Sequence, residues 1–382
     1  GELRSNSEFI PLSVSALARS RADWLYGINL TRAWTIKGQQ AGNRGVLSVG
    51  RVQTPVLGLV VRRDKEIRDF VSKPFYEVHA AIHLSAEQPL SFFAKWQPSE
   101  ACRPHQDDEG RVLNPNLAKN VVDRIRQQPA QVKAFDKKPG KQNAPLPYNL
   151  SSLQIDAAKA FGMAAKTVLD VCQSLYEKYQ LITYPRSDCR YLPVAHHREM
   201  PQVSAAIQTV IADAGDMLKH TDESRRSSAF NDKKVGVHHA IIPTSKKYSG
   251  NLNDAEKKIY RLIARQYLLQ FCGAFQYSDT LIELEIAGGR FIARERITLA
   301  AGWKALMPAR EKTSPPLPDL VAGQALWSGE PKLEEKHTEP PKHYTDATLL
   351  AAMTGIARYV KDPELRKVLK DTDGLGLSLI HI

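Results

Sequence analysis

The chain is organised around one stretch of ten residues, Leu181-Ile182-Thr183-Tyr184-Pro185-Arg186-Ser187-Asp188-Cys189-Arg190. Pro185 ends any helix and cannot donate to a sheet ladder, so Tyr184 is expected at a strand end or in a turn. A phenol is a poor nucleophile because its pKa is about 10, but neighbouring cations such as Arg186 and Arg190 favour the phenolate and can bind a phosphate. The stretch therefore indicates a tyrosine nucleophile for phosphoryl transfer. The alternative is a buried tyrosine before a turn proline, with surface arginines.

The composition is that of a basic globular protein. The chain has 382 residues, enough for two or three domains, and 42% of them are hydrophobic. Lysine and arginine total 53 against 41 acidic residues, a net charge of +12, which favours a polyanionic partner such as nucleic acid. The sequence contains no apolar run of membrane-spanning length, no signal-peptide pattern and no CxxC pair among its four cysteines. We therefore expect no membrane partner and a reducing, cytoplasmic environment.

A second candidate site lies near the start of the chain. A helix is expected over residues 13–35, followed by a polar loop and the segment Ser48-Val49-Gly50-Arg51-Val52-Gln53-Thr54-Pro55. Thr54 and Pro55 are expected to be the N-cap and first residue of another helix. Arg51 and Gln53 then precede the helix amino terminus, where free N–H groups and the dipole favour a phosphate. The alternative is a capped surface helix with an unrelated arginine.

The residues before the tyrosine stretch predict two helices. Ser151 and Ser152 can cap a helix that is broken at Gly162, and a second helix is expected over residues 164–179, followed by a strand at Leu181. Two helices around a glycine turn with a following strand resemble a winged helix-turn-helix, a unit that binds nucleic acid. An ordinary helical hairpin is the alternative.

The remaining segments alternate between regular elements and polar connections. Residues 76–85 alternate in polarity like a half-buried strand, and Gly288-Gly289 is typical of a hairpin turn. The acidic triplet Asp107-Asp108-Glu109 is expected to be solvated, because consecutive acids point in different directions. Loops or domain connections are expected over 97–116, 117–141, 213–236 and 308–343, and helices over 254–271 and 345–360.

Two adjacent histidines, His238 and His239, lie in a segment that continues to Thr244. Neighbouring side chains face different ways in regular structure, so the two are not expected to bind one metal ion together. A single histidine close to Tyr184 can instead donate to a phosphate oxygen.

Three segments together resemble the signatures of type IA DNA topoisomerases: Tyr184-Pro185-Arg186-Ser187-Asp188, the segment Ser48 to Pro55, and His238-His239-Ala240-Ile241 with Pro243-Thr244. They occur in the family's order and spacing, and the likeness extends over nearly the whole chain. It is greatest for the bacterial topoisomerase III branch. The resemblance implies a multidomain α+β fold, a toroid in which a β-rich arch lifts the tyrosine domain to open a gate.

The resemblance also implies a division into domains. A helical DNA-binding domain is expected from two segments, a β-rich arch from two more, and a catalytic tyrosine domain with a winged-helix-like unit between the arch segments. The implied boundaries are 1–71 and 345–376 for the helical domain, 72–134 and 261–344 for the arch, 135–260 for the tyrosine domain, and 377–382 for a tail foreign to the family.

The activity implied by the resemblance is ATP-independent DNA strand passage. Tyr184 is expected to attack a phosphodiester of single-stranded DNA and form a 5′-phosphotyrosine bond, so that another strand passes before resealing, which relaxes negative supercoils and decatenates DNA. Arg186 would stabilise the phosphate, and His238 would support the reaction. The expected DNA-binding residues are Ser48, Val49, Gly50, Arg51, Val52, Gln53 and Arg190.

The sequence departs from the family in two places, of which the first bears on the cofactor. The family uses Mg²⁺ bound by acids of an amino-terminal Toprim domain, and no Asp-x-Asp followed by Arg-Glu-Gly-Glu occurs in this chain. No metal ligand is therefore expected here. After Gly376 the branch usually continues Thr-Glu-Ala-Thr-Arg, whereas this chain has Leu377-Ser378-Leu379-Ile380. The chain is expected to be an interior fragment that binds single strands and stays weak or inactive until the Toprim domain is supplied.

Two other hypotheses about the function stand beside this one. One is a non-catalytic single-stranded DNA-binding protein; another is a tyrosine recombinase, whose Arg-His-Arg-Tyr order does not fit, since Tyr184 precedes His238.

The resemblance implies single-stranded DNA as partner, together with a helicase or a single-stranded DNA-binding protein, in the cytoplasm at the bacterial nucleoid. The loop around residues 97–111 stands where topoisomerase III enzymes carry an insertion linked to decatenation.

Overall fold

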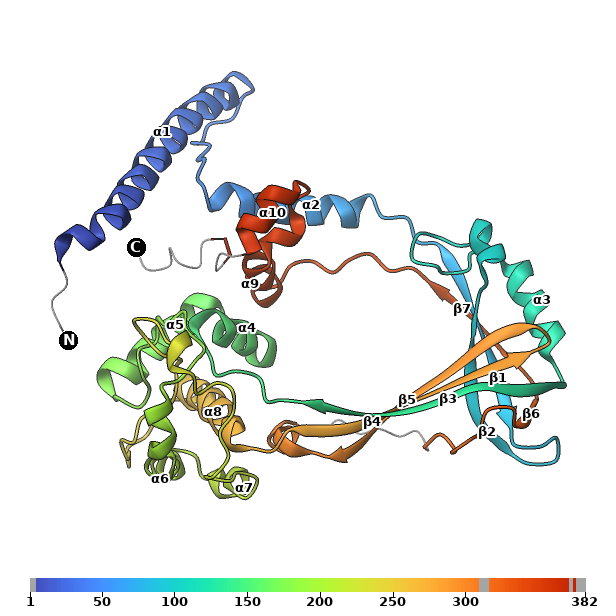
Figure 1. Ribbon diagram of the computed structural model, residues 1–382. Coiled ribbons are helices and arrows are strands. Elements are labelled where there is room, and N and C mark those ends of the chain that lie inside the picture. Colours follow the sequence, from blue (N-terminus) through green and yellow to red (C-terminus); the bar gives the residue numbers. More distant parts are fainter. Residues whose placement is uncertain (1–4, 309–315, 371–373, 376–382) are drawn as a thin grey trace. The chain divides into compact units, whose positions relative to one another are not determined.

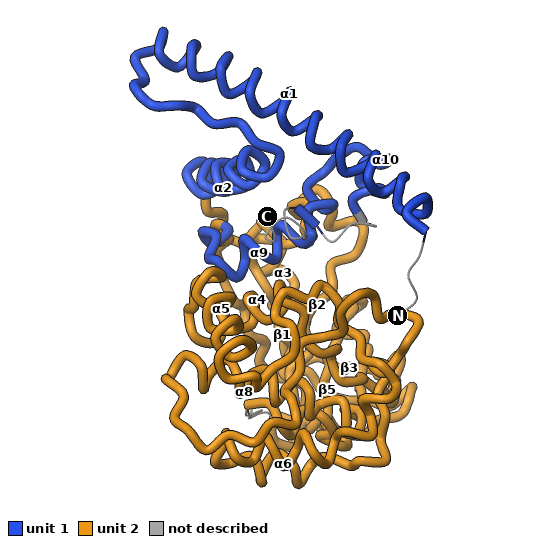
Figure 2. Tube along the Cα trace, turned by 90° about the vertical axis from the view of Figure 1, so that its left-hand side faces the viewer, with its two compact units in different colours: residues 1–70, 341–382 blue, residues 71–340 orange. Residues whose placement is uncertain are grey.

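The computed structural model describes residues 5–308, 316–370 and 374–375. It combines helices with a large antiparallel sheet, so the fold is multidomain α+β. The chain divides into two compact units, residues 1–70 with 341–382, and residues 71–340 (Figure 2). The expected tail over 377–382 and the residues Asp373 and Gly376 lie outside the described residues.

The first unit is helical throughout its regular elements (Figure 1). The long helix α1 extends beyond the expected 13–35, because Lys37, Gln39 and Gln40 favour helix and Gly42, with φ of 89°, follows its end. A helix after Val360 was not expected; Asp362 caps it by accepting the N–H groups of Glu364 and Leu365. The elements are the 3-10 turn Asn6–Phe9, α1 Ile10–Gln40, α2 Gln53–Arg68, α9 Asp346–Thr354, the 3-10 turn Ile356–Tyr359 and α10 Pro363–Lys370.

A small core joins α2 to the later helices of this unit. Leu59 of α2 packs with Ala352 and Ile356. The Arg63 guanidinium lies 4.3 Å from the ring centroid of Tyr344, which holds the chain before α9 against α2. By contrast, none of the residues Ile10–Gln40, all of them described, is buried.

The second unit contains a seven-stranded antiparallel sheet in the order β2-β5-β4-β3-β6-β1-β7 (Figure 1). Because β2 also pairs with β1, six strands form a closed ring and β7 lies outside it. The hairpin of β4 and β5 has Gly288 at φ of 74° in its turn, as the sequence predicted. The strands are β1 Pro74–His83, β2 Leu90–Gln97, β3 Gln128–Gln142, β4 Phe275–Ile286, β5 Gly289–Ala300, β6 Ala325–Ser328 and β7 Lys332–His337.

The sheet encloses one of the two large cores. Alternate residues of β2 and β4 are buried, as a strand with one face in a core requires. Helix α3, Pro115–Ile125, adds Val121 and Ile125 to this core, and the Asn114 side chain caps its first turn. The core therefore belongs to the strands and one helix.

The other core lies among helices between β3 and β4. Its largest fully buried side chains include Tyr148, Tyr260 and Tyr267. The helices are α4 Leu150–Phe161, α5 Ala165–Gln173, α6 Met200–Val210, α7 Ala214–Leu218 and α8 Asp254–Leu268. Short turns complete this part: a π turn Ser174–Lys178 and 3-10 turns Val194–Glu199, Asp232–Lys234 and Leu269–Phe271.

Several expected connections are regular structure. The stretch 117–141 was expected to be a connection because it contains Pro139-Gly140, but it forms α3 and β3. β3 pairs with β6 only over 128–131, so among the described residues its far part has an unpaired edge, which tolerates a proline. A Cβ on Gly140 would clash with the Tyr277 ring, so a larger residue would require that ring to move.

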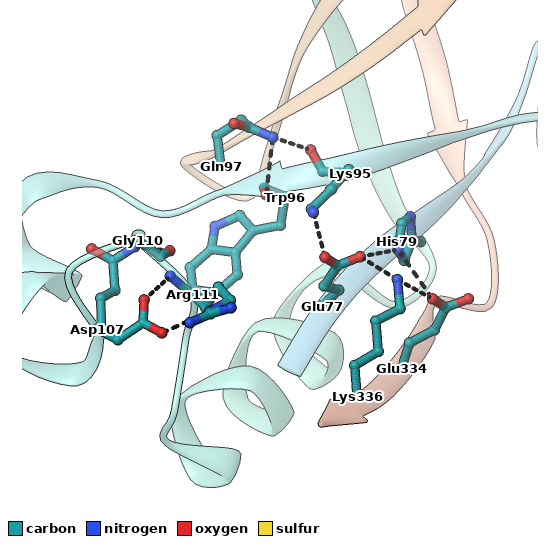
Figure 3. Close-up of polar contacts among 11 residues, drawn as sticks. Glu77, His79, Lys95, Trp96, Gln97, Asp107, Gly110, Arg111, Glu334 and Lys336 are labelled. Atoms are coloured by element: carbon teal, nitrogen blue, oxygen red, sulfur yellow. Dashed lines mark hydrogen bonds and ion pairs between the residues drawn. The ribbon is translucent and has the colours of Figure 1, made fainter. Parts of the chain in front are cut away.

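Three other expected loops also contain regular elements. The 97–116 loop includes the 3-10 turn Glu100–His105, and its acid Asp107 pairs with Arg111 at 2.7 Å instead of standing free in solvent (Figure 3). The 213–236 loop contains α7, and 308–343 contains β6 and β7, apart from the undescribed 309–315. Short alternating or charged strands such as these carry too few apolar residues to be recognised by periodicity.

A cluster of charged side chains on β1, β2 and β7 places lysines beside two glutamates that would otherwise repel each other (Figure 3). Glu77 and Glu334 are direct cross-strand partners, and like charges in this position repel each other. Lys336 Nζ lies 2.8 Å from Glu77 Oε2 and 3.1 Å from Glu334 Oε2, and Lys95 Nζ lies 2.6 Å from Glu77 Oε1. Burial acts to raise the pKa of Glu77, but the two ammonium groups outweigh it and lower that pKa to about 2.

The substitution Glu77→Gln tests this cluster. It is expected to lower the free energy of unfolding by about 1–2 kcal/mol at pH 7, because it removes charge-assisted hydrogen bonds. A carboxylate with a lowered folded-state pKa stabilises above its ordinary pKa of 4.5 and stops doing so as the pH falls towards 2. The difference from the unsubstituted chain, measured by urea unfolding, should therefore shrink between pH 4.5 and 2.

The matched control is Glu87→Gln, at an exposed position between β1 and β2. It should change stability by less than about 0.5 kcal/mol at any pH. A Glu77→Gln effect that is equally large at pH 7 and near pH 2 would contradict the assigned role of the lysines.

Candidate active site

Backbone pairing with a distant segment holds the tyrosine stretch in place. An isolated bridge stands where the sequence predicted a strand at Leu181, since Pro185 cannot continue a ladder. The pairing brings Tyr184 beside residues 238–244. Its contacts are the Thr183 N–H to Ile242 O at 2.9 Å, the Thr244 N–H to Leu181 O at 3.0 Å, and the bridge between Ile182 and Pro243.

Two rings contact the half-buried Tyr184 side chain. The centroid of the His238 ring lies 4.3 Å from the Tyr184 centroid, with 31° between the ring planes. The Tyr176 ring meets Tyr184 edge-on at 5.9 Å and 81°. His238 itself is exposed. The structure therefore brings together the tyrosine and the histidine that the sequence singled out.

Arg186 is oriented by a glutamine at the end of α5. Its Nη2 donates to Gln173 Oε1 at 3.0 Å, and Gln173 Nε2 donates to Glu177 Oε1 at 2.8 Å. Because arginine only donates and a carboxylate only accepts, the amide of Gln173 has one orientation that satisfies both. The π turn after α5 carries Glu177 and also Tyr176, so it supports two side chains of the tyrosine stretch.

The end of the stretch is fastened to the start of α4. Ser187 is buried, its carbonyl accepts the Leu150 N–H at 3.0 Å, and the Asp188 carbonyl accepts from the Asn149 side chain at 3.0 Å. Asn149 is also the N-cap of α4, in place of the expected Ser151 or Ser152, and Ser152 completes its capping box.

The Arg190 guanidinium donates hydrogen bonds to two backbone carbonyls. Its Nε donates to Pro147 O and its Nη2 to Leu146 O, both at 2.9 Å. Burial lowers the pKa of Arg190, against the opposing effect of Asp156. Its contact with DNA stays a prediction, and the observed bonds give it a part in holding the stretch together.

The second candidate segment lies in the other compact unit. Threonines of α1 hold it, because Thr35 Oγ1 accepts the Leu47 N–H at 3.0 Å and Thr31 Oγ1 accepts the Val49 N–H at 2.9 Å. Arg51 forms a two-pronged pair with Asp23 of α1, with Nε–Oδ1 at 2.6 Å and Nη2–Oδ2 at 2.9 Å.

The start of α2 differs from the sequence expectation. The helix begins at Gln53, with Val52 as N-cap and no side-chain capping bond. Thr54 is therefore inside the first turn, and its Oγ1 accepts the Gly50 N–H at 3.1 Å. Arg51 still precedes the helix, whereas Gln53 belongs to it.

The chain matches known proteins over almost its entire length. Residues 7–376 match the family described as DNA topoisomerase. The chain belongs to this family.

Relatives within the family carry the name DNA topoisomerase 3. The protein of that name from Salmonella typhimurium is 54% identical over 380 residues, covering 98% of this chain and 58% of the relative. The one from Vibrio cholerae is 55% identical over 379 residues, covering 98% and 59%. This topoisomerase chain therefore spans somewhat less than two thirds of the length of these curated relatives.

A solved structure supports the fold. Full-length topoisomerase I from Thermotoga maritima aligns with 93% of this chain and 55% of its own, at a TM-score of 0.60 and 22% identity. The fold is thus that of a type IA topoisomerase. Among the described residues, no helix is both long and apolar enough to cross a bilayer.

The side chains do not suit a resident Mg²⁺. In the part of the chain that the structure describes, one group of three possible ligands has metal-like spacing, namely Glu77, His79 and Glu334 (Figure 3). Magnesium prefers oxygen ligands to imidazole, and the Lys336 ammonium already bridges the two carboxylates. Among the described residues, this group is therefore an ion-pair cluster and not a magnesium site.

Gln173 and Tyr176, near Tyr184, were not among the residues that the sequence singled out, and His239 was expected only as a neighbour of His238 in the third signature. Gln173 and Tyr176 were expected only as parts of one long helix over 164–179. Their roles depend on the π turn, which interrupts that helix and which no residue pattern announces. The i, i+4 spacing of Gln173 and Glu177 was the available signal.

The substitution Arg190→Lys tests the fastening of the stretch. An ammonium group cannot reproduce the guanidinium fork, so one of the two charge-assisted hydrogen bonds to Pro147 O and Leu146 O is expected to be lost. The free energy of unfolding is expected to fall by about 1–3 kcal/mol, measured by urea unfolding. Arg198→Lys, at an exposed position, is the control and should be nearly neutral. Equal free energies of unfolding for both variants would show that the two contacts of Arg190 do not contribute to stability.

Proposed function

We propose that this chain carries the tyrosine-bearing part of a topoisomerase III-like type IA enzyme. Such an enzyme cleaves one DNA strand, passes another through the gap and reseals the first without ATP, relaxing negative supercoils and decatenating DNA. The observation that carries the proposal is the contact of the Tyr184 ring with His238, in a segment where Arg186 stands two residues further on. The 54–55% identity to proteins named DNA topoisomerase 3 supports it.

The proposed reaction is a reversible transesterification. Tyr184 Oη forms a bond to the phosphorus of a strand, and the bond from phosphorus to the 3′ oxygen breaks. The phenol loses its proton and the departing 3′ oxygen gains one, leaving a 5′-phosphotyrosine and a free 3′ hydroxyl. Because one phosphoester replaces another, the reverse attack by the 3′ hydroxyl reseals the strand without an energy source.

Arg186 and His238 have matched roles in this proposal. Arg186 uses one nitrogen for Gln173, and the guanidinium has further N–H groups that can bind phosphate oxygens. His238 is exposed beside the phenol, where it can donate to the same phosphate or accept from the phenol. Charge that develops on the phosphate would be met by these donors.

Strand binding is proposed for the segment Ser48, Val49, Gly50, Arg51, Val52 and Gln53, and for Arg190. The bonds from Thr31 and Thr35 support a fixed shape for that segment, which a backbone-contacting loop needs. Asp23 would have to share or release Arg51 when a phosphate binds.

The domain division belongs to the same proposal, with boundaries after residues 71, 134, 260, 344 and 376. Strands of one sheet come from residues 74–142 and 275–337, with the tyrosine-bearing helices between them, and this arrangement supports an arch built from two segments.

The proposals for cofactor, partners and location rest mainly on the family. We propose dependence on Mg²⁺, single-stranded DNA as substrate, cooperation with a helicase or a single-stranded DNA-binding protein, and location in the cytoplasm at the nucleoid. The net charge of +12 supports a nucleic-acid partner.

The decisive experiment uses a single-stranded oligonucleotide labelled at its 3′ end. It is mixed with Mg²⁺ and either this chain or a chimera in which this chain replaces the matching part of the Salmonella relative. After denaturation, label that migrates with protein reports a 5′-phosphotyrosine bond. The chimera is expected to form this adduct, and the chain alone is expected to bind the strand in a salt-dependent manner.

Tyr184→Phe is the matched control, since it removes only the phenol oxygen. It should abolish the adduct and leave strand binding unchanged. An adduct that survives in Tyr184→Phe, or its absence from the unsubstituted chimera, would overturn the proposed role of Tyr184.

A further inference from the structure

One backbone carbonyl lies between the nucleophile segment and the histidine segment. Ala240 is fully buried, and its oxygen accepts two side-chain hydrogen bonds. Thr183 Oγ1 donates to it at 3.1 Å, and His239 Nδ1 lies 2.8 Å from it. Thr183 directly precedes Tyr184, and His239 directly follows His238. Each donor to this carbonyl is thus the sequence neighbour of one of the two contacting rings, Tyr184 and His238.

The threonine side of this junction is fully determined. Thr183 Oγ1 accepts the Ile242 N–H at 3.0 Å while it donates to Ala240 O. The Thr183 N–H in turn donates to Ile242 O at 2.9 Å. Three hydrogen bonds thus fix Thr183 against residues 240–242, which leaves Tyr184 little freedom at its backbone.

The histidine side fixes a tautomer. A carbonyl oxygen can only accept, so Nδ1 of His239 must carry a proton. Burial lowers the pKa of His239 and His196 and His238 add to this effect, which outweighs the opposing hydrogen bond to Ala240 O and the charge of Glu199. The ring is therefore neutral at pH 7, with its proton on Nδ1. His196 packs edge-on against it, with ring centroids 4.7 Å apart.

We propose that His239 is a positioning residue, which holds His238 stacked on Tyr184 through the shared carbonyl of Ala240. The inference rests on the proposed function, because it gives that stacking a purpose in strand cleavage. His239 touches no reacting atom. Its effect is to stop the backbone of residues 238–240 from turning, so that the exposed His238 ring remains over the phenol.

The geometry can be tested on this chain without any activity. An aromatic ring shifts the NMR signals of protons stacked on it, so the His238 ring protons report the contact with Tyr184. Tyr184→Leu defines the signal position of an unstacked His238. His239→Leu is expected to move the His238 signals by more than half of the way to that position. His239→Asn keeps a side-chain N–H donor and is expected to restore most of the original shift.

Two further variants keep the test decisive. His220→Leu, at an exposed position of the same unit, is the matched control and should leave the His238 signals unchanged. Thr183→Val removes the other donor to Ala240 O, and it is expected to move the same signals in the same direction even if His239→Leu fails to fold. His238 signals that stay in place in a folded His239→Leu chain, or in Thr183→Val if His239→Leu does not fold, would overturn the inference.

The adduct assay supplies the second measurement. In the chimera, His239→Leu is expected to slow label transfer about tenfold, because small displacements of reacting groups cost large factors in rate. Strand binding should stay within about twofold, and His239→Asn should recover most of the rate. Equal slowing by His239→Asn and His239→Leu would contradict the positioning role. An unsubstituted chimera that forms no adduct would count against the proposed function, while the NMR result would still decide the inference.

Discussion

The candidate site depends on the pairing of residues 181–183 with residues 242–244. These segments are about 60 residues apart in the sequence, and closing so long a loop costs only slightly more entropy than closing a shorter one. Leu181 and Ile242 are buried on the inner side of the pairing, so the hydrophobic core of the helical part holds it closed. The polar side chains of Tyr184, Arg186 and His238 are then presented from a rigid base, which is the arrangement that orientation-dependent chemistry requires.

Much of the fold could be predicted from local patterns, and the failures have physical causes. The hairpin at Gly288-Gly289 and the helix over 254–271 follow from turn chemistry and periodicity. Strand β3 could not be recognised, because a proline and a glycine are normally found outside strands. The proline is tolerated at an edge that is unpaired among the described residues, and the glycine leaves room for the Tyr277 ring. The closing of six strands into a ring is likewise invisible in sequence, since it depends on which distant strands pair.

The candidate site likewise contains residues that the sequence identifies and residues that it does not. Tyr184, Arg186 and His238 stand out because their residue types match a known signature and suit phosphoryl transfer. Gln173 does not stand out, and His239 stands out only as a member of the same signature without a role of its own, since their parts arise from a π turn and from a tautomer fixed by a buried carbonyl. Residues that react can be recognised by chemistry, whereas residues that orient them are defined only by the folded backbone.

Strand β7 has a consequence for the behaviour of the protein in solution. It ends the strand order in the part of the chain that the structure describes, so its outer backbone groups could recruit a strand from another molecule. Its sequence is Lys-Leu-Glu-Glu-Lys-His, with one apolar residue in six. A second copy arriving at this edge would have to bury charged side chains or align like charges. Lys336, which neutralises the paired glutamates, and the other charged side chains of β7 therefore disfavour edge-to-edge association of the sheet with a second copy.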